Sequence, residues 1–184
     1  MRGVPAYMED IHTGVEVIRS LVGSAVESAR SDEEKTLLDI IIHTSNDEEE
    51  IIDNVLTFFL AGYDTTASAL CTCLQVLHQD EHADILHSVL DELAHNETSV
   101  LDCVIKETLR LHPPSAGGIL RTFKDEHKDQ FPEHWRHNTD IIVPIYSLHR
   151  HPKYWDNPDV FIPSRWETTS EKEVCDVYMP FSVG

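Results

Sequence analysis

Polar side chains interrupt one apolar stretch of this sequence in a way that suits proton transfer. Asp64, Thr65 and Thr66 follow Gly62 and Tyr63, inside a run rich in Phe, Leu and Ala. A carboxylate beside a hydroxyl can pass protons, because a threonine hydroxyl both accepts and donates hydrogen bonds. The residues alone leave two interpretations equally open. One is a helix with a local bulge that faces a ligand, and the other is a tolerated glycine beside an exposed aspartate.

Glu107 and Arg110 form a second pair whose spacing suits an interaction. Residues three apart on a helix face each other, so these two side chains can form an ion pair. The pair alone is a weak signal, because exposed ion pairs contribute only ~0–1 kcal/mol to stability. On spacing alone, a solvent-exposed pair is the ordinary interpretation.

Histidines offer a third kind of chemistry, since the chain has 12 of them. His78 and His82 are one helical turn apart, a spacing that can bind a metal, and His87 follows nearby. His149 and His151 form another close pair. Spacing places no third ligand beside either pair, so the sequence predicts no metal site.

A long region without proline must position the first two groups. No proline lies between Pro5 and Pro113, and eight of the nine prolines fall from Pro113 onward. Apolar residues recur at helical spacing over residues 1–112, which predicts a helical portion with a long helix from about Glu48 to about Leu77. A further short helix is expected at residues 37–42. The N-terminal helix has an apolar stripe, which comprises Ile11, Val15, Ile18, Val22, Ala25 and Ala29.

The residue pattern changes after residue 113, where helical spacing gives way to short apolar runs and frequent prolines. Residues 119–123 and 140–145 are predicted as short strands separated by a polar loop, and residues 146–150 as one helical turn. The chain from Pro152 to Pro180 is punctuated by proline and is expected to be irregular. The sequence therefore predicts a mainly α protein with short β elements, an α+β class. We expect 1–184 to belong to a single domain, with a helical portion at 1–112 and short strands and irregular loops at 113–184.

The composition limits the partners. The formal net charge of −19 weighs against nucleic acid, because phosphate binding needs clustered Lys and Arg. The four cysteines have no CxxC spacing, which indicates reduced thiols in an intracellular compartment, and Cys71, Cys73 and Cys103 are predicted as small core residues. No apolar run approaches the ~20 residues that span a bilayer.

The order of four short motifs is more specific than any one of them. AGYDTT (61–66) precedes KETLR (106–110), which precedes PSRW (163–166) and a terminal PFSVG (180–184). In this order the motifs resemble those of the cytochrome P450 superfamily of haem-thiolate monooxygenases. The resemblance runs from before the central long helix to just before the haem-ligand cysteine. It implies a partial cytochrome P450 fold in which the N-terminal half and the haem-ligand loop are missing.

The resemblance also implies roles for the residues around the haem. Ala61 and Gly62 would lie over the haem face and leave room for dioxygen. Asp64 and Thr65 would form an acid–alcohol pair that relays protons to dioxygen at the haem. Arg121, just past the turn that follows the prolines, matches the position that binds a haem propionate.

The remaining motifs are implied to be structural or to approach the iron. Phe181 and Gly184 match the opening of the family's F-x-x-G-x-R-x-C loop. Glu107, Arg110 and Arg165 would form a buried charge network that supports the haem-side core. The PSRW motif departs from the family pattern, with serine where glutamate is common and tryptophan where phenylalanine is common.

The implied reaction is insertion of one oxygen atom from O2 into a small organic substrate, with electrons from a reductase or ferredoxin. Haem is the implied cofactor, and the full-length parent has room for a membrane anchor, for example at the endoplasmic reticulum. The iron-ligating cysteine would lie beyond Gly184, so we expect the chain by itself to be inactive. The alternative is a non-catalytic acidic helical interaction protein or remnant, which explains the charge but not the ordered motifs.

Overall fold

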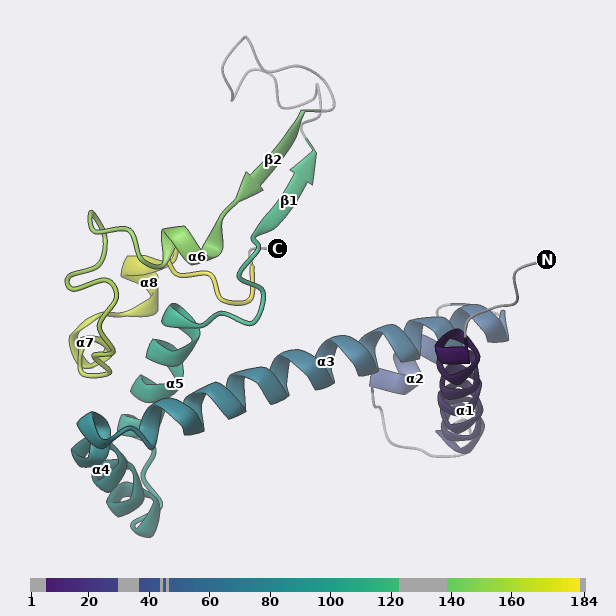
Figure 1. The fold of residues 1–184 in the computed structure, drawn as a ribbon, viewed down its shortest axis with the longest axis horizontal. Helices are drawn as coiled ribbons and strands as arrows, with labels where there is room; N and C mark the ends of the chain where they lie inside the picture. Colours follow the sequence, from purple (N-terminus) through teal and green to yellow (C-terminus); the bar gives the residue numbers. More distant parts are fainter. Residues whose placement is uncertain (1–5, 30–36, 44, 46, 123–138, 183–184) are drawn as a thin grey trace. The chain divides into compact units, whose positions relative to one another are not determined.

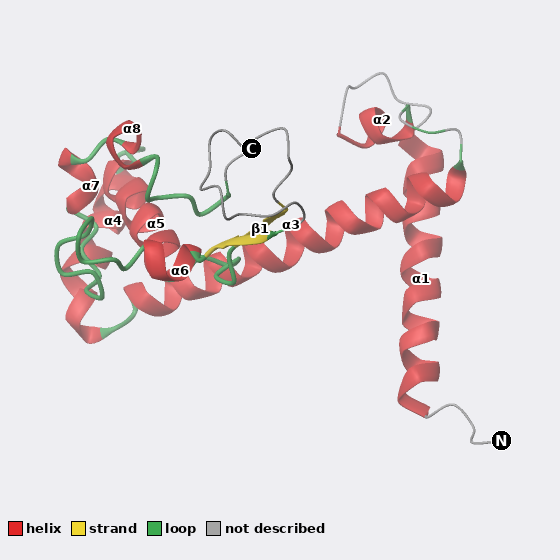
Figure 2. Cartoon of the chain, turned by 90° about the horizontal axis from the view of Figure 1, so that it is seen from above, coloured by secondary structure: helices red, strands yellow, loops and turns green. Residues whose placement is uncertain are grey.

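The structure is a computed structural model that describes residues 6–29, 37–43, 45, 47–122 and 139–182 (Figure 1). Helices account for most of the described residues, with one small sheet (Figure 2). The chain divides into two compact units, Met1–Asp64 and Thr65–Gly184. The long helix α3 runs through the boundary between them, and each unit is described below by itself.

The first unit contains α1 (Ala6–Ala29), α2 (Leu37–Ile42) and the first part of α3 (Glu48–Leu77). Its core is a small aliphatic cluster of Val26, Ile41, Ile42 and Ile51, against which Val22, Leu38 and Val55 pack. The predicted N-terminal helix and residues 37–42 are confirmed as helices. The stripe on α1 is only partly used, because Val15 and Ile18 remain exposed. Among the α1 residues whose side chains the structure describes, those that pack in the core, Val22 and Val26, lie in its C-terminal half.

Helix α3 begins and ends where its apolar spacing predicts, at Glu48 and Leu77. Its three N-terminal glutamates, at positions 48–50, favour a helix start because acidic side chains interact well with free backbone N–H groups there. The interpretation of a bulge is wrong, because the helix is α throughout and Asp64 is exposed. A Cβ added at Gly62 would meet nothing within 4 Å, so no close packing in the described chain disturbs the helix there.

The second unit continues from α3 through short elements and two further helices of three turns or more. These elements are η1 (Asp80–His82), α4 (Ala83–Ala94), α5 (Ser99–Leu111), β1 (Ile119–Thr122), β2 (Asp140–Val143), α6 (Ile145–Leu148), α7 (Arg165–Thr168) and α8 (Glu171–Val174). One apolar cluster joins α3, α4 and α5 through Leu77, Val89 and Val104, and Phe161 packs against it. Helix α5 ends just before the prolines that were predicted to terminate it.

The two predicted strands form an antiparallel hairpin in which Ile119 pairs with Val143 and Thr122 with Asp140. The second strand is shorter than predicted, because Pro144 lacks an N–H for the ladder and Ile145 begins α6. The helical turn predicted at 146–150 is accordingly found one residue earlier, and Phe123 lies outside the described residues. Gly118 has φ of 100°, and a Cβ there would lie 2.3 Å from the Val143 carbonyl oxygen, so this position requires glycine.

The prediction of Cys71, Cys73 and Cys103 as small core residues holds only in part, because Cys73 packs against the cluster that joins α3, α4 and α5. Cys71 is exposed, while Cys73 and Cys103 are half-buried. Helix α3 has more apolar residues than the described packing buries, so a small side chain such as that of Cys71 can remain exposed. The described helices include none that is both long enough and apolar enough to cross a membrane.

We predict that Ile51→Ala destabilises the first unit by about 2–5 kcal/mol, because Ile51 is only 1% exposed at the centre of its core. The matched control is Ile40→Ala on α2, since Ile40 is 62% exposed. Chemical denaturation followed by circular dichroism measures both changes. Equal losses in the two variants would show that this core does not form.

Candidate functional site

Helix α5 carries Glu107 and Arg110, and both of its ends are held by neighbouring segments. At its start, Glu92 of α4 accepts hydrogen bonds from the Ser99 hydroxyl and from the Val100 N–H at 2.7 Å. These contacts satisfy donors that the first turn of a helix leaves free. The last turns of α5, from Glu107 to Leu111, are buried on all sides. The two charged residues therefore lie within the protein interior and not on its surface.

The Glu107 carboxylate accepts five hydrogen bonds. Arg110 donates two in a bidentate arrangement, from Nε to Oε2 at 2.9 Å and from Nη2 to Oε1 at 2.8 Å. Arg165 Nε donates to Oε1 at 3.0 Å, as does the Ile162 N–H. The Trp166 indole N–H donates to Oε2 at 3.0 Å. Glu107 is 0% exposed, so these donors replace the water that the carboxylate has lost.

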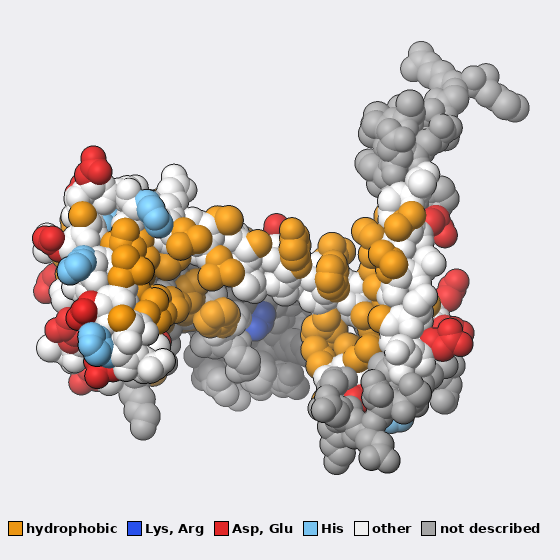
Figure 3. Space-filling model, turned by 90° about the horizontal axis from the view of Figure 1, so that it is seen from below, with side chains coloured by type: hydrophobic (Ala, Val, Ile, Leu, Met, Phe, Trp, Pro, Cys, Tyr) orange, Lys and Arg blue, Asp and Glu red, His pale blue; other side chains and the backbone are white. Residues whose placement is uncertain are grey.

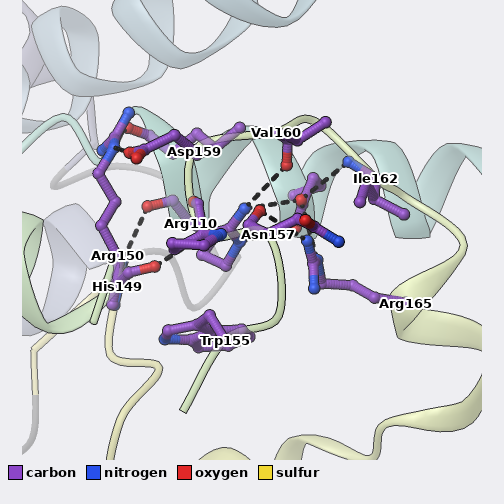
Figure 4. A network of polar contacts seen from close by, with 12 residues as sticks. Arg110, His149, Arg150, Trp155, Asn157, Asp159, Val160, Ile162 and Arg165 are labelled. Carbon is purple, nitrogen blue, oxygen red and sulfur yellow. Dashed lines mark hydrogen bonds and ion pairs between the residues drawn. The ribbon is translucent and has the colours of Figure 1, made fainter. Parts of the chain in front are cut away.

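Arg110 is also fully buried, and all five of its N–H groups are used (Figure 4). Besides Glu107, it donates to three backbone carbonyls: to His149 at 2.8 Å, to Pro158 at 2.6 Å and to Val160 at 3.2 Å. Its guanidinium carbon lies 5.2 Å from the centre of the Trp155 ring. One side chain thus fixes an irregular segment of the chain that lies far from α5 in the sequence.

The structure brings together the three charged residues that the motifs indicated. Arg165 reaches Glu107 from α7, with its side chain 12% exposed, whereas the side chains of Glu107 and Arg110 are 0% exposed. Sequence reasoning missed Trp166 as a donor, although the tryptophan in place of the common phenylalanine was a usable signal. It also missed Ile162 and His149, for which the sequence holds no signal, because a backbone N–H and a buried imidazole act here through tertiary contacts.

Two opposing effects set the protonation of Glu107. Burial alone would raise the pKa of this carboxyl, but the hydrogen bonds from Arg110 and the Ile162 N–H, with the charges of Arg110 and Arg165, outweigh it. The pKa is therefore held below its ordinary value of 4.5, and the group is ionised at neutral pH. Among the described residues, no buried side-chain nitrogen or oxygen lacks a hydrogen-bond partner.

A cavity of about 430 Å³ lies beside this network in the second unit. Thr65 and Ala69 of α3 line it together with Leu109 of α5, and residues 180–182 form another part of its wall. The lining is mostly apolar, with a few hydroxyl groups. Two of the predicted haem-site residues, Thr65 and Phe181, thus contribute to one cavity.

The other predicted haem-site residues do not line that cavity. Ala61 and Gly62 lie on an exposed part of α3. Arg121 is exposed on β1, and its Nη1 donates to the Leu120 carbonyl at 3.2 Å. Phe181 lines the cavity but is 84% exposed. Gly184 lies outside the described residues.

No group of three His, Cys, Asp or Glu side chains in the described part of the chain is arranged to hold a metal ion. Each imidazole of the His78 and His82 pair instead lies within hydrogen-bond distance of a backbone carbonyl. His78 Nδ1 lies 2.8 Å from the Leu74 oxygen, and His82 Nδ1 lies 2.9 Å from the Val76 oxygen.

We predict that Glu107→Gln destabilises the second unit by about 3–5 kcal/mol, because it leaves Arg110 buried without its counter-charge. Glu97→Gln, an exposed position in the loop after α4, is the matched control and should change stability by less than about 0.5 kcal/mol. Urea unfolding at pH 7 measures both.

Comparison of Glu107→Gln with the unmodified chain also tests the protonation of Glu107. The folded pKa lies below the ordinary 4.5, so the stabilisation from the ionised carboxylate is present above pH 4.5 and is lost as pH falls below it. The loss of stability between pH 5 and pH 3 should therefore be smaller in Glu107→Gln than in the unmodified chain. Parallel pH profiles would contradict an ionised, buried Glu107.

We predict that Trp166→Phe costs more stability than Trp155→Phe. Trp166 donates to a carboxylate, whereas Trp155 donates to the neutral carbonyl of Leu148 at 3.1 Å. Hydrogen bonds to charged groups contribute about 1.5–3 kcal/mol, and neutral ones about 0.5–1.5 kcal/mol. Both rings are buried and pack against each other, so the two substitutions remove similar apolar contacts. An equal or reversed order in thermal unfolding would show that the Trp166 bond to Glu107 is not charge-assisted.

Comparison with known proteins identifies the family. The family model for cytochrome P450 matches residues 7–184. The sequence is 34% identical over 185 residues to cytochrome P450 4d8 of Drosophila melanogaster, covering 89% of this chain and 40% of that protein. It is 32% identical over 159 residues to cytochrome P450 3A17 of Cavia porcellus, covering 77% of this chain and 30% of that protein.

The fold is similar to that of solved cytochrome P450 structures. The crystal structure of a cytochrome P450 (CYP102L1) has a TM-score of 0.72 to this structure at 21% sequence identity, covering 97% of this chain and 46% of that one. The chain thus spans less than half the length of each of these proteins. The expected mainly helical, partial cytochrome P450 fold is confirmed. The family model's match over nearly all of the sequence shows that the chain belongs to the cytochrome P450 family.

Proposed function

We propose that residues 1–184 are part of a single haem-dependent monooxygenase domain that inserts one oxygen atom from O2 into a small organic substrate. Haem monooxygenase chemistry is the general activity of the family to which the chain belongs. The observation that carries the proposal is the cavity that Thr65 and residues 180–182 share beside the Glu107 network. It combines an apolar volume with a hydroxyl group that stands next to a carboxylate in the sequence.

The cavity has the size and the apolar character of a small-molecule site. Its volume of about 430 Å³ lies in the usual range for small-molecule sites, and its apolar lining suits the faces of a porphyrin. When bound, haem supplies the redox chemistry that activates dioxygen. Thr65 and Phe181 would contact this group in the cavity, and Arg121 on β1 would bind a propionate.

Asp64 and Thr65 are the residues to which we assign proton transfer. Thr65 lines the cavity, and a threonine hydroxyl can donate a proton and accept another in turn. Asp64 precedes it on α3 and is exposed to solvent, so it can exchange protons with water. Ala61 and Gly62, one turn earlier, keep the adjacent helix surface free of bulky side chains.

The surface of the chain supports membership of a larger domain. Along α3, large apolar side chains are exposed, among them Phe58, Phe59, Leu60 and Leu70, each more than half exposed. Figure 3 shows such apolar side chains gathered at the surface of the described residues. Exposed apolar patches of this extent mark surfaces that other parts of a protein cover. The greater length of the relatives is consistent with this proposal.

A thiolate ligand for haem is the one element of the proposed site that we assign to none of the four cysteines. None of the four cysteines lies in the terminal motif, and Cys175 is exposed upstream of it. A thiolate ligand favours cleavage of the O–O bond, so we propose that this polypeptide alone does not catalyse hydroxylation. In the full-length parent, electrons would come from a reductase or ferredoxin, and an anchor could hold the protein to the endoplasmic reticulum membrane.

An acidic interaction module remains the alternative, and the net charge of −19 is the observation that favours it. The module does not require the buried Glu107 network. A haem-binding scaffold uses that network to hold the cavity wall in place.

We predict that haem titrated into the purified polypeptide binds saturably in the cavity. Ala69→Trp fills the cavity and should weaken haem binding at least about tenfold, because the added side chain takes the volume of the ligand. Ala94→Trp at the exposed end of α4 is the control and should leave binding unchanged. Quenching of tryptophan fluorescence, referenced to each variant, measures the affinity.

The reduced, carbon monoxide-treated sample tests the thiolate separately. It should show no Soret band of the thiolate-ligated type. A thiolate band would contradict the proposed lack of activity, and Cys73→Ser and Cys175→Ser would show which sulfur is responsible. Haem binding that Ala69→Trp leaves unaffected would contradict the assignment of the cavity.

A further inference from the structure

His149 is a buried histidine to which none of the roles described above applies. It directly follows α6, is 0% exposed, and its ring stacks on Tyr178 with 5.3 Å between ring centres. Two hydrogen bonds hold its imidazole. Nδ1 lies 3.1 Å from the carbonyl oxygen of Arg110, and Nε2 lies 2.9 Å from the backbone nitrogen of Met179.

These two partners fix the proton on the ring. A backbone carbonyl can only accept a hydrogen bond, so Nδ1 must carry a hydrogen. A backbone N–H can only donate, so Nε2 must present its lone pair. A charged imidazolium would lose the Met179 contact, and the opposite neutral tautomer would lose both contacts. The geometry therefore requires the neutral Nδ1–H ring, whereas free histidine in water favours the proton on Nε2.

His149 and Arg110 also bind each other reciprocally. The Arg110 guanidinium donates to the His149 carbonyl at 2.8 Å, while the His149 ring donates to the Arg110 carbonyl. Arg150 donates to the carbonyl of Leu111. The last carbonyls of a helix have no partner within the helix, so these two consecutive side chains cap the end of α5.

The other side of the imidazole reaches the cavity wall. Met179 immediately precedes residues 180–182, which line the cavity with Thr65. The Tyr178 hydroxyl donates to the Lys106 carbonyl at 3.1 Å, so Tyr178 is attached to α5 directly and Met179 is attached through His149. Residues 179–182 belong to no helix or strand, so their position depends on such contacts.

We propose that His149 is a positioning residue whose neutral Nδ1–H ring joins the end of α5 to Met179 and thereby sets the position of the cavity wall at residues 180–182. The inference concerns the cavity itself and not the chemistry of haem. Its test needs no haem, so its failure is distinguishable from failure of the proposed function.

The charges around the ring make this junction sensitive to acid. The cations near the His149 ring are Arg110 of α5 and Arg150, the residue after His149. Glu107, on the same helix as Arg110, neutralises the charge of Arg110. Burial is the main cause that lowers the pKa of His149 from 6.5 to about 4, and the charges of Arg110 and Arg150 act in the same direction. The hydrogen bond to the Arg110 carbonyl acts in the opposite direction. Because the folded pKa lies below the unfolded one, the junction is intact above pH 6.5 and is lost as pH falls toward 4.

The tautomer can be read directly in the unmodified chain. Long-range ¹H–¹⁵N spectra of the ¹⁵N-labelled protein at pH 7 should show His149 with a protonated Nδ1 and an unprotonated Nε2. The ring should keep this pattern at pH 6 and titrate with a midpoint near pH 4. An Nε2–H pattern, or a midpoint near 6.5, would overturn the proposal even if no variant folds.

Two substitutions separate the contacts. His149→Asn retains an amide near the Nδ1 position but cannot reach Met179, so exchange of the Met179 amide hydrogen should become about tenfold faster, equivalent to one lost hydrogen bond. His149→Gln places its side-chain oxygen near the Nε2 position and should preserve most of the protection at Met179. Unchanged exchange in His149→Asn, or equal acceleration in both variants, would show that the imidazole does not hold this segment.

Discussion

The structure of the second unit depends on one desolvated carboxylate. Glu107 has no contact with water, and an ionised carboxylate in that position is tolerated only when its charge is neutralised and its lone pairs are filled. Five donors do this, from α5 itself, from the backbone at Ile162 and from two consecutive residues of α7. Each donor is held in place by its hydrogen bond to the Glu107 carboxylate. Segments that share no sheet or long helix are thereby brought to one point.

Arg110 extends the same constraint to the irregular part of the chain. All five of its N–H groups donate hydrogen bonds, and three of them donate to the backbone carbonyls of His149, Pro158 and Val160. Those carbonyls lie outside regular secondary structure and would otherwise need water. A guanidinium presents its donors in a rigid plane, so the positions of these carbonyls are defined by the geometry of one side chain. Order in this loop comes from polar contacts and aromatic packing on Trp155, not from a backbone ladder.

His149 links this framework to the cavity. Its ring is hydrogen-bonded to the Arg110 carbonyl and to the Met179 N–H, and the residues after Met179 line the cavity together with Thr65 of α3. The Glu107–Arg110 network and the candidate site are therefore connected through hydrogen bonds within the second unit. By contrast, the first unit is held by a small aliphatic core, and the exposed apolar residues of α3 indicate surfaces that further packing would cover.

The sequence alone determined the limits of α3, the end of α5 before its prolines and the strand pairing region, because each depends on local spacing and backbone chemistry. It also indicated the family, through the order of short motifs. Burial of Glu107 and Arg110 was expected only through the family resemblance, since their spacing alone indicated an exposed pair. Only the tertiary structure decided that Trp166 donates to Glu107 and that His149 is locked in one tautomer. The contacts of Trp166 and His149 join residues 30 to 59 positions apart. The pairing of such distant groups depends on desolvation and three-dimensional geometry, which local residue patterns do not contain.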